Sequence, residues 1–145
     1  EAVGVTIHLP VDHVIGQEFD PDTPSKIVPR NQIPIDWEGF DIGPETVEVF
    51  GQVIDRTETI FWNGPVGVYE FDQFAVGTLS LAKRIAKTDA ISVIGGGDCV
   101  AAVQKAGVAD QISHISTGGG ASLELIEGKE LPGIATLTDK ADYSS

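Results

Sequence analysis

The chain is 145 residues long, which is typical of one domain with a hydrophobic core of its own. Hydrophobic residues make up 41% and charged residues 21% of it, so a disordered or fibrous protein is excluded. Its 22 acidic and 9 basic residues leave a formal net charge of −13, which repels polyanions, and we expect no nucleic-acid partner. No apolar run reaches the roughly 18–20 residues of a membrane span, and we expect no membrane partner.

The cysteine and methionine content bears on origin and compartment. Cys99 is the single cysteine and cannot form an internal disulfide, so we expect a reducing compartment, the cytoplasm, with a plastid as the alternative. The chain contains no methionine and so lacks an initiator, and we expect it to be part of a longer protein. Small polar residues at 141–145 predict a flexible tail.

The spacing of apolar residues predicts strands that alternate with helices. In chain order, the expected elements are a strand at Val5–Leu9, a loop with an edge strand or hairpin across the proline-rich stretch from Glu18 to Glu38, a helix at Pro44–Ile54, a strand at Thr59–Trp62, a helix at Asp72–Lys87, a strand at Ala90–Ile94, a helix at Val100–Ala106, a strand at Ile112–Ile115 and a helix at Ala121–Ile126. These strands are apolar throughout, which is typical of parallel strands buried on both faces. We therefore predict an α/β fold, a parallel sheet with helices on both faces in a Rossmann-like three-layer arrangement, forming part of a domain.

Three loops follow predicted strands, at Asn63–Glu70, Gly95–Asp98 and Ser116–Ser122. In open parallel sheets, ligands bind beyond the carboxyl ends of the strands. Glycines ahead of a helix let backbone N–H groups approach a phosphate, which the helix dipole then helps to hold without a cationic side chain. A single glycine run favours a tight turn with close helix–sheet packing instead, but its repetition in two successive loops favours phosphate binding.

Two common nucleotide motifs are excluded by neighbouring residues. Val100 and Leu123 stand where the dinucleotide fingerprint needs glycine or alanine, and Gly128-Lys129-Glu130 lacks the hydroxyl of a P-loop.

Several side chains near these loops have two interpretations each. Asp98 is either the N-cap of the following helix or a ligand of a nucleotide-borne Mg²⁺. Glu70 either binds ribose hydroxyls or complements a helix dipole. Asn63-Gly64 suggests a hairpin turn, but Pro65 follows, so a ligand loop is at least as good an interpretation. Cys99 is expected to be a small buried side chain and not a nucleophile.

Five motifs, taken together and in this order, resemble phosphoglycerate kinase. They are LPVD at Leu9–Asp12, DIGP at Asp41–Pro44, WNGPVGVYE at Trp62–Glu70, IGGGD at Ile94–Asp98 and HISTGGGASLELIEGKELPG at His114–Gly133. The resemblance is collinear over nearly the whole chain and ends near Leu137. Cys99 departs from it, because family members often carry Thr or Ser there, and Glu38 and Phe40 stand where Met and Leu are frequent.

The resemblance implies a two-domain, monomeric kinase that transfers a phosphoryl group reversibly from 1,3-bisphosphoglycerate to MgADP, giving 3-phosphoglycerate and MgATP. Residues 1–140 would be the carboxy-terminal portion of its nucleotide-binding domain. The residues that it places at the nucleotide are Phe40 at the adenine, Asn63, Pro65 and Val68 along the cleft, Glu70 at the ribose, and Gly95, Gly96, Gly97, Asp98 and Cys99 at the phosphates, with Asp98 also at the Mg²⁺. It places Gly118, Gly119 and Gly120 at the transferring phosphoryl group, and His114 and Thr117 in the interdomain hinge.

The basic residues indicate what the chain lacks for catalysis. Phosphoryl transfer depends on positioning and on cations that stabilise the moving group, and none of the nine basic residues lies in a glycine loop. In the family, the basic triose-phosphate site and the nucleotide-contacting lysines belong to earlier parts of the protein, so we expect the isolated chain to be inactive. The alternatives are a non-catalytic phosphate- or nucleotide-binding α/β module, and an α/β domain whose glycines are only structural.

Overall fold

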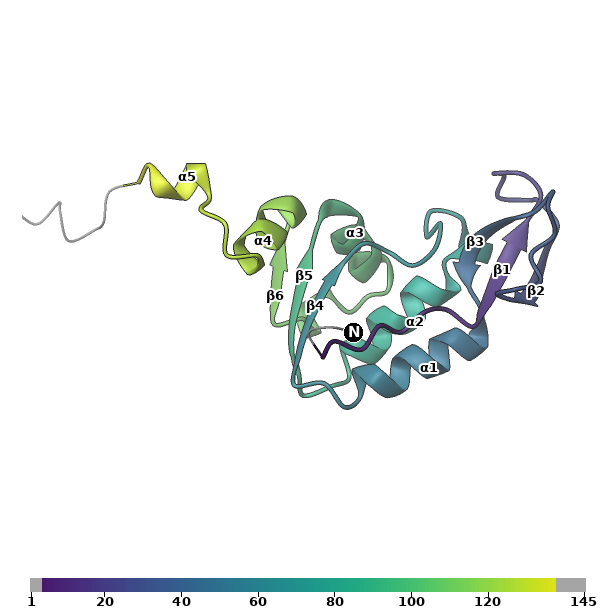
Figure 1. The fold of residues 1–145 in the computed structure, drawn as a ribbon, viewed down its shortest axis with the longest axis horizontal. Coiled ribbons are helices and arrows are strands. Elements are labelled where there is room, and N and C mark those ends of the chain that lie inside the picture. Colours follow the sequence, from purple (N-terminus) through teal and green to yellow (C-terminus); the bar gives the residue numbers. More distant parts are fainter. Residues whose placement is uncertain (1–3, 138–145) are drawn as a thin grey trace, which may run out of the picture.

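The computed structural model describes residues 4–137. The expected tail at 141–145 and the expected domain end at 140 lie outside the described residues. Figure 1 shows an antiparallel sheet at one end of the molecule and a parallel sheet nearer its middle, with α1 (Pro44–Ile54) and α2 (Val76–Ile85) running between them. Among the described residues, no helix is long and apolar enough to cross a membrane.

The antiparallel sheet comes from the amino-terminal third of the chain. Its strands β1 (Asp12–Gly16), β2 (Ser25–Pro29) and β3 (Glu38–Ile42) are ordered β2-β1-β3. The β1–β2 hairpin pairs Val14 with Ile27, and β2 is an edge strand, which confirms the prediction for the proline-rich stretch. The sequence did not indicate β1 or β3, because both mix acidic and apolar residues over only five positions.

The parallel sheet contains β4 (Thr59–Asn63), β5 (Ile91–Gly95) and β6 (His114–Ser116), in the order β4-β5-β6. Trp62 is paired with Ile94, and Ile94 with Ile115, so the three carboxyl ends lie in one row. The predicted parallel sheet of an α/β fold is confirmed by these three strands.

The predicted strand at residues 5–9 is wrong. These residues form no strand, and Val5, Ile7 and Leu9 are 60%, 73% and 57% exposed. A strand exists only where a neighbouring strand accepts its backbone hydrogen bonds, and no strand among residues 4–137 pairs with this segment.

The helices differ from the prediction mainly at their starts. Helix α1 begins at Pro44, as expected, whereas the segment predicted as one helix at 72–87 divides into the 3₁₀ turn η1 (Asp72–Phe74) and α2. The two helical segments meet at Ala75; Phe74 before it is buried in the core, and the Gly77 N–H after it donates to the Asp41 carboxylate of β3.

Glycines form the first turns of two later helices. Helix α3 (Gly97–Lys105) begins three residues earlier than predicted, and α4 (Gly119–Ile126) begins two residues earlier. Glycine is unfavourable in helix interiors, which is why the sequence pattern put both starts after the glycines. The remaining elements are the turn η2 (Ala109–Gln111) and the short α5 (Pro132–Ala135).

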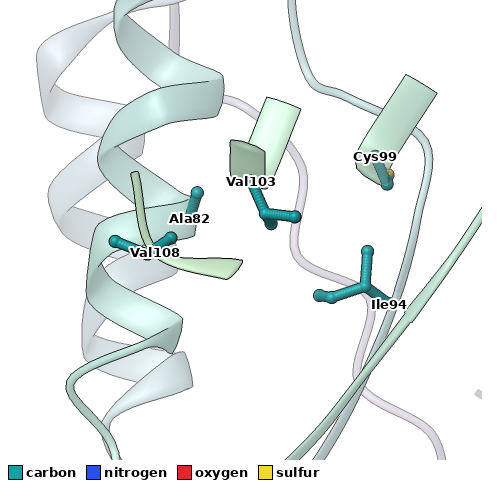
Figure 2. Packing of buried hydrophobic residues seen from close by; sticks show 5 residues of the cluster. All are labelled: Ala82, Ile94, Cys99, Val103 and Val108. Atoms are coloured by element: carbon teal, nitrogen blue, oxygen red, sulfur yellow. The ribbon is translucent and has the colours of Figure 1, made fainter. Parts of the chain in front are cut away.

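The core joins the parallel sheet to α2 and α3. Figure 2 shows its buried side chains, which are Ala82 of α2, Ile94 of β5, Cys99 and Val103 of α3, and Val108 after α3. Because α3 packs here through Cys99 and Val103, its amino terminus is held at the carboxyl end of β5.

Candidate nucleotide-phosphate site

The three predicted loops lie side by side at the carboxyl ends of the strands of the parallel sheet. Strands β4 and β5 pair Asn63 with Gly95, and β5 and β6 pair Gly95 with Ser116, so each loop starts beside the next. The Gly96 N–H donates to the Ser116 carbonyl at 3.0 Å, which joins the two glycine loops directly. The sequence-based expectation that these loops form one site is therefore compatible with the fold.

Asn63 lies between the two glycine loops. A Cβ atom on Gly96 would lie 2.9 Å from the Asn63 Oδ1, and one on Gly119 would lie 2.6 Å from this oxygen and 2.8 Å from the Gly96 Cα. Gly96 also has a φ of +92°, in the region that favours glycine. Close backbone approach therefore explains the glycines at 96 and 119, and the tight-turn interpretation applies to them.

The remaining glycines of the runs behave differently. A Cβ atom on Gly97 or Gly120 would meet no atom within 4 Å, and on Gly118 none nearer than 3.8 Å, whereas on Gly95 it would lie 2.9 Å from the Phe61 ring. Packing within the described chain therefore does not require glycine at 97 or 120. These two positions leave space beside the first turns of α3 and α4, where helical N–H groups have no partner within their own helix. An anion can approach both backbones there.

The loop after β4 presents a different kind of surface. Its N–H groups at Gly64, Val66, Gly67 and Val68 all donate to protein atoms, and Pro65 has none. This loop therefore faces a ligand with side chains and carbonyls, whereas the glycine loops offer N–H groups.

A pocket of about 350 Å³ lies between this loop and β3. Its walls bring together Phe40, Pro65 and Val68, three residues assigned to the nucleotide cleft from the sequence. Phe40 is only 6% exposed and packs on Phe74 with ring centroids 5.0 Å apart, so its ring is held in place by the core next to the pocket. His13 and Asp41 also line the pocket, so its walls combine apolar and polar groups.

Asp98 and Glu70 are exposed, and the structural alternative for each is wrong. The N-cap of α3 is Gly96 and no side chain caps it, so Asp98 stands in the first turn without that role. Glu70 lies in the turn before Phe71 and is in no helix, so it does not complement a dipole. The described residues contain no group of three side chains that could hold a metal ion by themselves.

Cys99 is 1% exposed, as expected for a small core residue. Burial raises the pKa of its thiol, so the thiol stays protonated at neutral pH. The Sγ accepts a hydrogen bond from the Gly64 N–H and faces the loop after β4 from below. The Cys99 side chain is therefore buried away from a bound phosphate. Its backbone N–H, in the first turn of α3, is the part of this residue that could bind one.

The two residues that the sequence assigned to the hinge, His114 and Thr117, lie at the start of β6 and directly after its end. His114 opens this strand and is exposed, and Thr117 is exposed between β6 and Gly118. Their role in a hinge stays a prediction.

Sequence reasoning missed the residues that hold the loop after β4 from behind. Lys105, at the end of α3, donates to the Tyr69 carbonyl and pairs with the Asp72 carboxylate, both at 2.8 Å. Asp41 and Thr78 lie beneath the loop and are buried. Asp41 belongs to the DIGP motif, which was a signal for it, whereas nothing in the spacing of Thr78 or Lys105 connects them with this loop.

A parallel sheet whose strand ends carry open glycine turns at helix starts is typical of α/β proteins that bind phosphates and nucleotides. The phosphoglycerate kinase family model matches residues 1–129, and the chain belongs to this family. The cytosolic phosphoglycerate kinase 3 of Arabidopsis thaliana is 55% identical over 142 residues, and the chloroplastic phosphoglycerate kinase 2 of the same plant is 54% identical. These alignments cover 96% of the chain but only 35% and 30% of the two relatives, so the chain spans about a third of their length.

The solved structure of phosphoglycerate kinase from Coxiella burnetii superposes with a TM-score of 0.86 at 40% identity, over 92% of this chain and 35% of that one. This agreement extends the likeness from sequence to fold.

Proposed function

We propose that the chain is the carboxy-terminal portion of the nucleotide-binding domain of a phosphoglycerate kinase, with residues 1–140 as that portion. In the complete enzyme, it would bind the nucleotide during reversible phosphoryl transfer from 1,3-bisphosphoglycerate to MgADP, giving 3-phosphoglycerate and MgATP. The observation that carries the proposal is the convergence of Asn63, Gly96 and Gly119, which leaves Gly97 and Gly120 open beside two helix starts.

Each loop contributes a distinct interaction. The pocket walled by Phe40, Pro65 and Val68 takes the base, and Glu70, exposed at the end of the same loop, accepts hydrogen bonds from the ribose hydroxyls. Backbone N–H groups in the first turn of α3 bind the nucleotide phosphates. Those at Gly118–Gly120 stabilise charge on the transferring group, because N–H groups fixed by the fold need no reorganisation during the reaction.

Asp98 fits a magnesium ion that arrives with the nucleotide. Magnesium keeps water and phosphate oxygens as ligands and takes one or two protein carboxylates. The Asp98 carboxylate has no ion-pair partner in the described residues and stands beside the open Gly97, so it is free to serve as that ligand. When bound, the metal neutralises phosphate charge, while this chain orients the nucleotide.

The chain by itself lacks the cations that phosphoryl transfer requires. None of its nine basic residues lies in a glycine loop, and Lys105, which reaches the loop after β4, donates to the Tyr69 carbonyl and pairs with Asp72. We therefore propose that the isolated chain binds nucleotide without turnover. The complete protein would be a monomer, and its cytoplasmic location is proposed from the cytosolic relative, with the plastid as the alternative because a chloroplastic relative is nearly as similar.

Titration with MgADP, followed by tryptophan fluorescence, tests the proposal. The Trp62 Nε1 donates to the Gly64 carbonyl at 2.7 Å, so its emission reports on the nucleotide loop. A Trp37→Phe background removes the second tryptophan. We expect a saturable change with MgADP, weakened by Asp98→Ala and absent with MgCl₂ alone. A chain that is folded by circular dichroism and does not respond to MgADP would overturn the proposal for this chain.

A further inference from the structure

The loop after β4 is held by side chains of two different helices. Thr78, in the first turn of α2, is fully buried, and its Oγ1 accepts the N–H groups of Val66 and Gly67, both at 3.2 Å. Cys99, in the first turn of α3, accepts the Gly64 N–H. The N–H groups of Val66 and Gly67 thus share one acceptor, the Thr78 hydroxyl oxygen. The Gly64 N–H, on the other side of Pro65, has the Cys99 sulfur as its acceptor.

Neither side chain reaches the surface on which a nucleotide would lie. Thr78 is 0% and Cys99 is 1% exposed, so both act from beneath the loop. Gly64 is held from two directions, since the Trp62 Nε1 donates to its carbonyl and Cys99 accepts from its N–H. Its φ of +110° shows that the turn at this residue requires glycine.

The same contacts connect the parts of the site. Thr78 follows Gly77, whose N–H donates to the buried Asp41 carboxylate of β3. The first turn of α2 therefore binds both β3 and the loop after β4, which are the two walls of the 350 Å³ pocket. Cys99 follows the Gly95–Asp98 loop directly and binds the loop after β4. The first turn of α3 therefore fixes the distance between these two loops.

We propose that Thr78 and Cys99 are positioning residues for nucleotide binding, which hold the loop from Gly64 to Val68 at the distance from β3 and from the phosphate loop that the nucleotide requires. This inference rests on the proposed function of the same site. It assigns a role to two side chains that do not contact the ligand, and it predicts that affinity depends on their hydrogen-bond acceptors more than on their volume.

Matched variants separate the acceptor from the volume. Thr78→Val keeps the shape of the side chain but removes the acceptor of two N–H groups, whereas Thr78→Ser keeps the hydroxyl. Cys99→Ala removes the second acceptor, and Cys99→Ser retains one. A buried donor without an acceptor carries its full desolvation cost, so the loop should open more often in the Val and Ala variants than in the Ser variants.

Amide hydrogen exchange of the full chain, resolved by residue, reads the position of the loop without any ligand. In Thr78→Val, we expect exchange at Val66 and Gly67 to accelerate about tenfold or more relative to the amides of β5, and in Thr78→Ser to stay near the wild type. In Cys99→Ala, hydrogen exchange at the Gly64 amide should accelerate in the same selective way. If Thr78→Val does not fold, the Cys99→Ala variant alone tests the proposal. Equal acceleration in the loop and in β5 would show a general loss of stability and overturn the proposal.

The MgADP dissociation constant of each folded variant completes the test. We expect it to rise about tenfold in Thr78→Val and Cys99→Ala and to recover in the two Ser variants. If the wild-type chain binds MgADP and the Val and Ala variants bind it equally well, the positioning role is refuted while the proposed function stands. If the folded wild-type chain does not bind MgADP, the proposed function fails, and the positioning role fails with it.

Discussion

Replacing Asp41 by asparagine should remove a pH dependence of folding stability that the wild-type chain shows in mildly acidic solution. Asp41 is 3% exposed, and desolvation by burial raises the pKa of its carboxyl from an ordinary 3.8 to about 6. The Gly77 and Ile42 N–H groups donate to its two oxygens at 2.7 and 2.8 Å, and these bonds oppose the rise only in part. The folded chain therefore binds this proton more tightly than the unfolded chain does.

The sign and size of the effect follow from this difference. Well below pH 3.8, the carboxyl is protonated in both states, and the stability from this group is fully present. As the pH rises towards about 6, the unfolded chain loses the proton first, so the free energy of unfolding falls, and it levels off above the folded-state pKa. The full shift corresponds to about 3 kcal/mol, of which most should be lost between about pH 4 and pH 7.

The assay is urea unfolding of both proteins, followed by circular dichroism, at several values across this pH range. The Asp41→Asn variant would lose one acceptor for a backbone N–H, but this cost is the same at every pH and does not alter the slope. Asp12, whose pKa is lowered by hydrogen bonds from Thr46 and Glu45 against the opposing effect of burial, contributes with the opposite sign in both proteins and cancels in the difference. A wild-type stability that changes with pH in parallel with that of Asp41→Asn would refute the reasoning.

Three further outcomes are expected. Gly119→Ala should lower the free energy of unfolding by about 1–3 kcal/mol, because its Cβ would meet the backbone of the neighbouring loop. Gly120→Ala, where a Cβ meets no atom, should change the free energy of unfolding by less than about 0.5 kcal/mol. Equal effects of the two substitutions in urea unfolding would contradict this packing. Asp98→Asn should weaken MgADP binding in calorimetry by about tenfold and leave binding of metal-free ADP unchanged, and a loss of both would argue against a metal ligand. Arg84→Met should destabilise the chain at low salt and less at high salt, since Arg84 bridges two acidic side chains of α1 and its carboxyl end; a salt-independent loss would point to packing alone.

The parallel sheet could be predicted from the sequence because its strands carry their own signal. The runs that became β4 and β5 are short, apolar and rich in β-branched residues, which is the composition of such strands; most of β5 is buried, and the three central residues of β4 are partly buried. The run at residues 5–9 has the same composition and forms no strand, because composition does not supply a hydrogen-bonding neighbour. Conversely, β1 and β3 have weak individual signals and exist because they pair with each other.

The candidate site divides in the same way. The glycine runs and the Asn63–Glu70 loop could be identified from the sequence, since glycine between a strand and a helix has few local explanations. The sequence could not tell which glycines serve packing and which leave space, because this depends on how Asn63, Gly96 and Gly119 approach across three strands. It also could not connect Thr78 with the loop after β4, because that contact depends on how the start of α2 packs beneath the loop.

By itself, therefore, the sequence determined the α/β class, the glycine loops at the strand ends and the resemblance to phosphoglycerate kinase, since each is written in local composition and in the order of motifs along the chain. The tertiary structure alone decided the register that brings the three loops into one row and the burial that raises the pKa of Asp41. It also decided which helices supply the acceptors beneath the loop. These properties depend on distances between residues that are far apart in sequence, and such distances are set only when the strands pair and the helices pack.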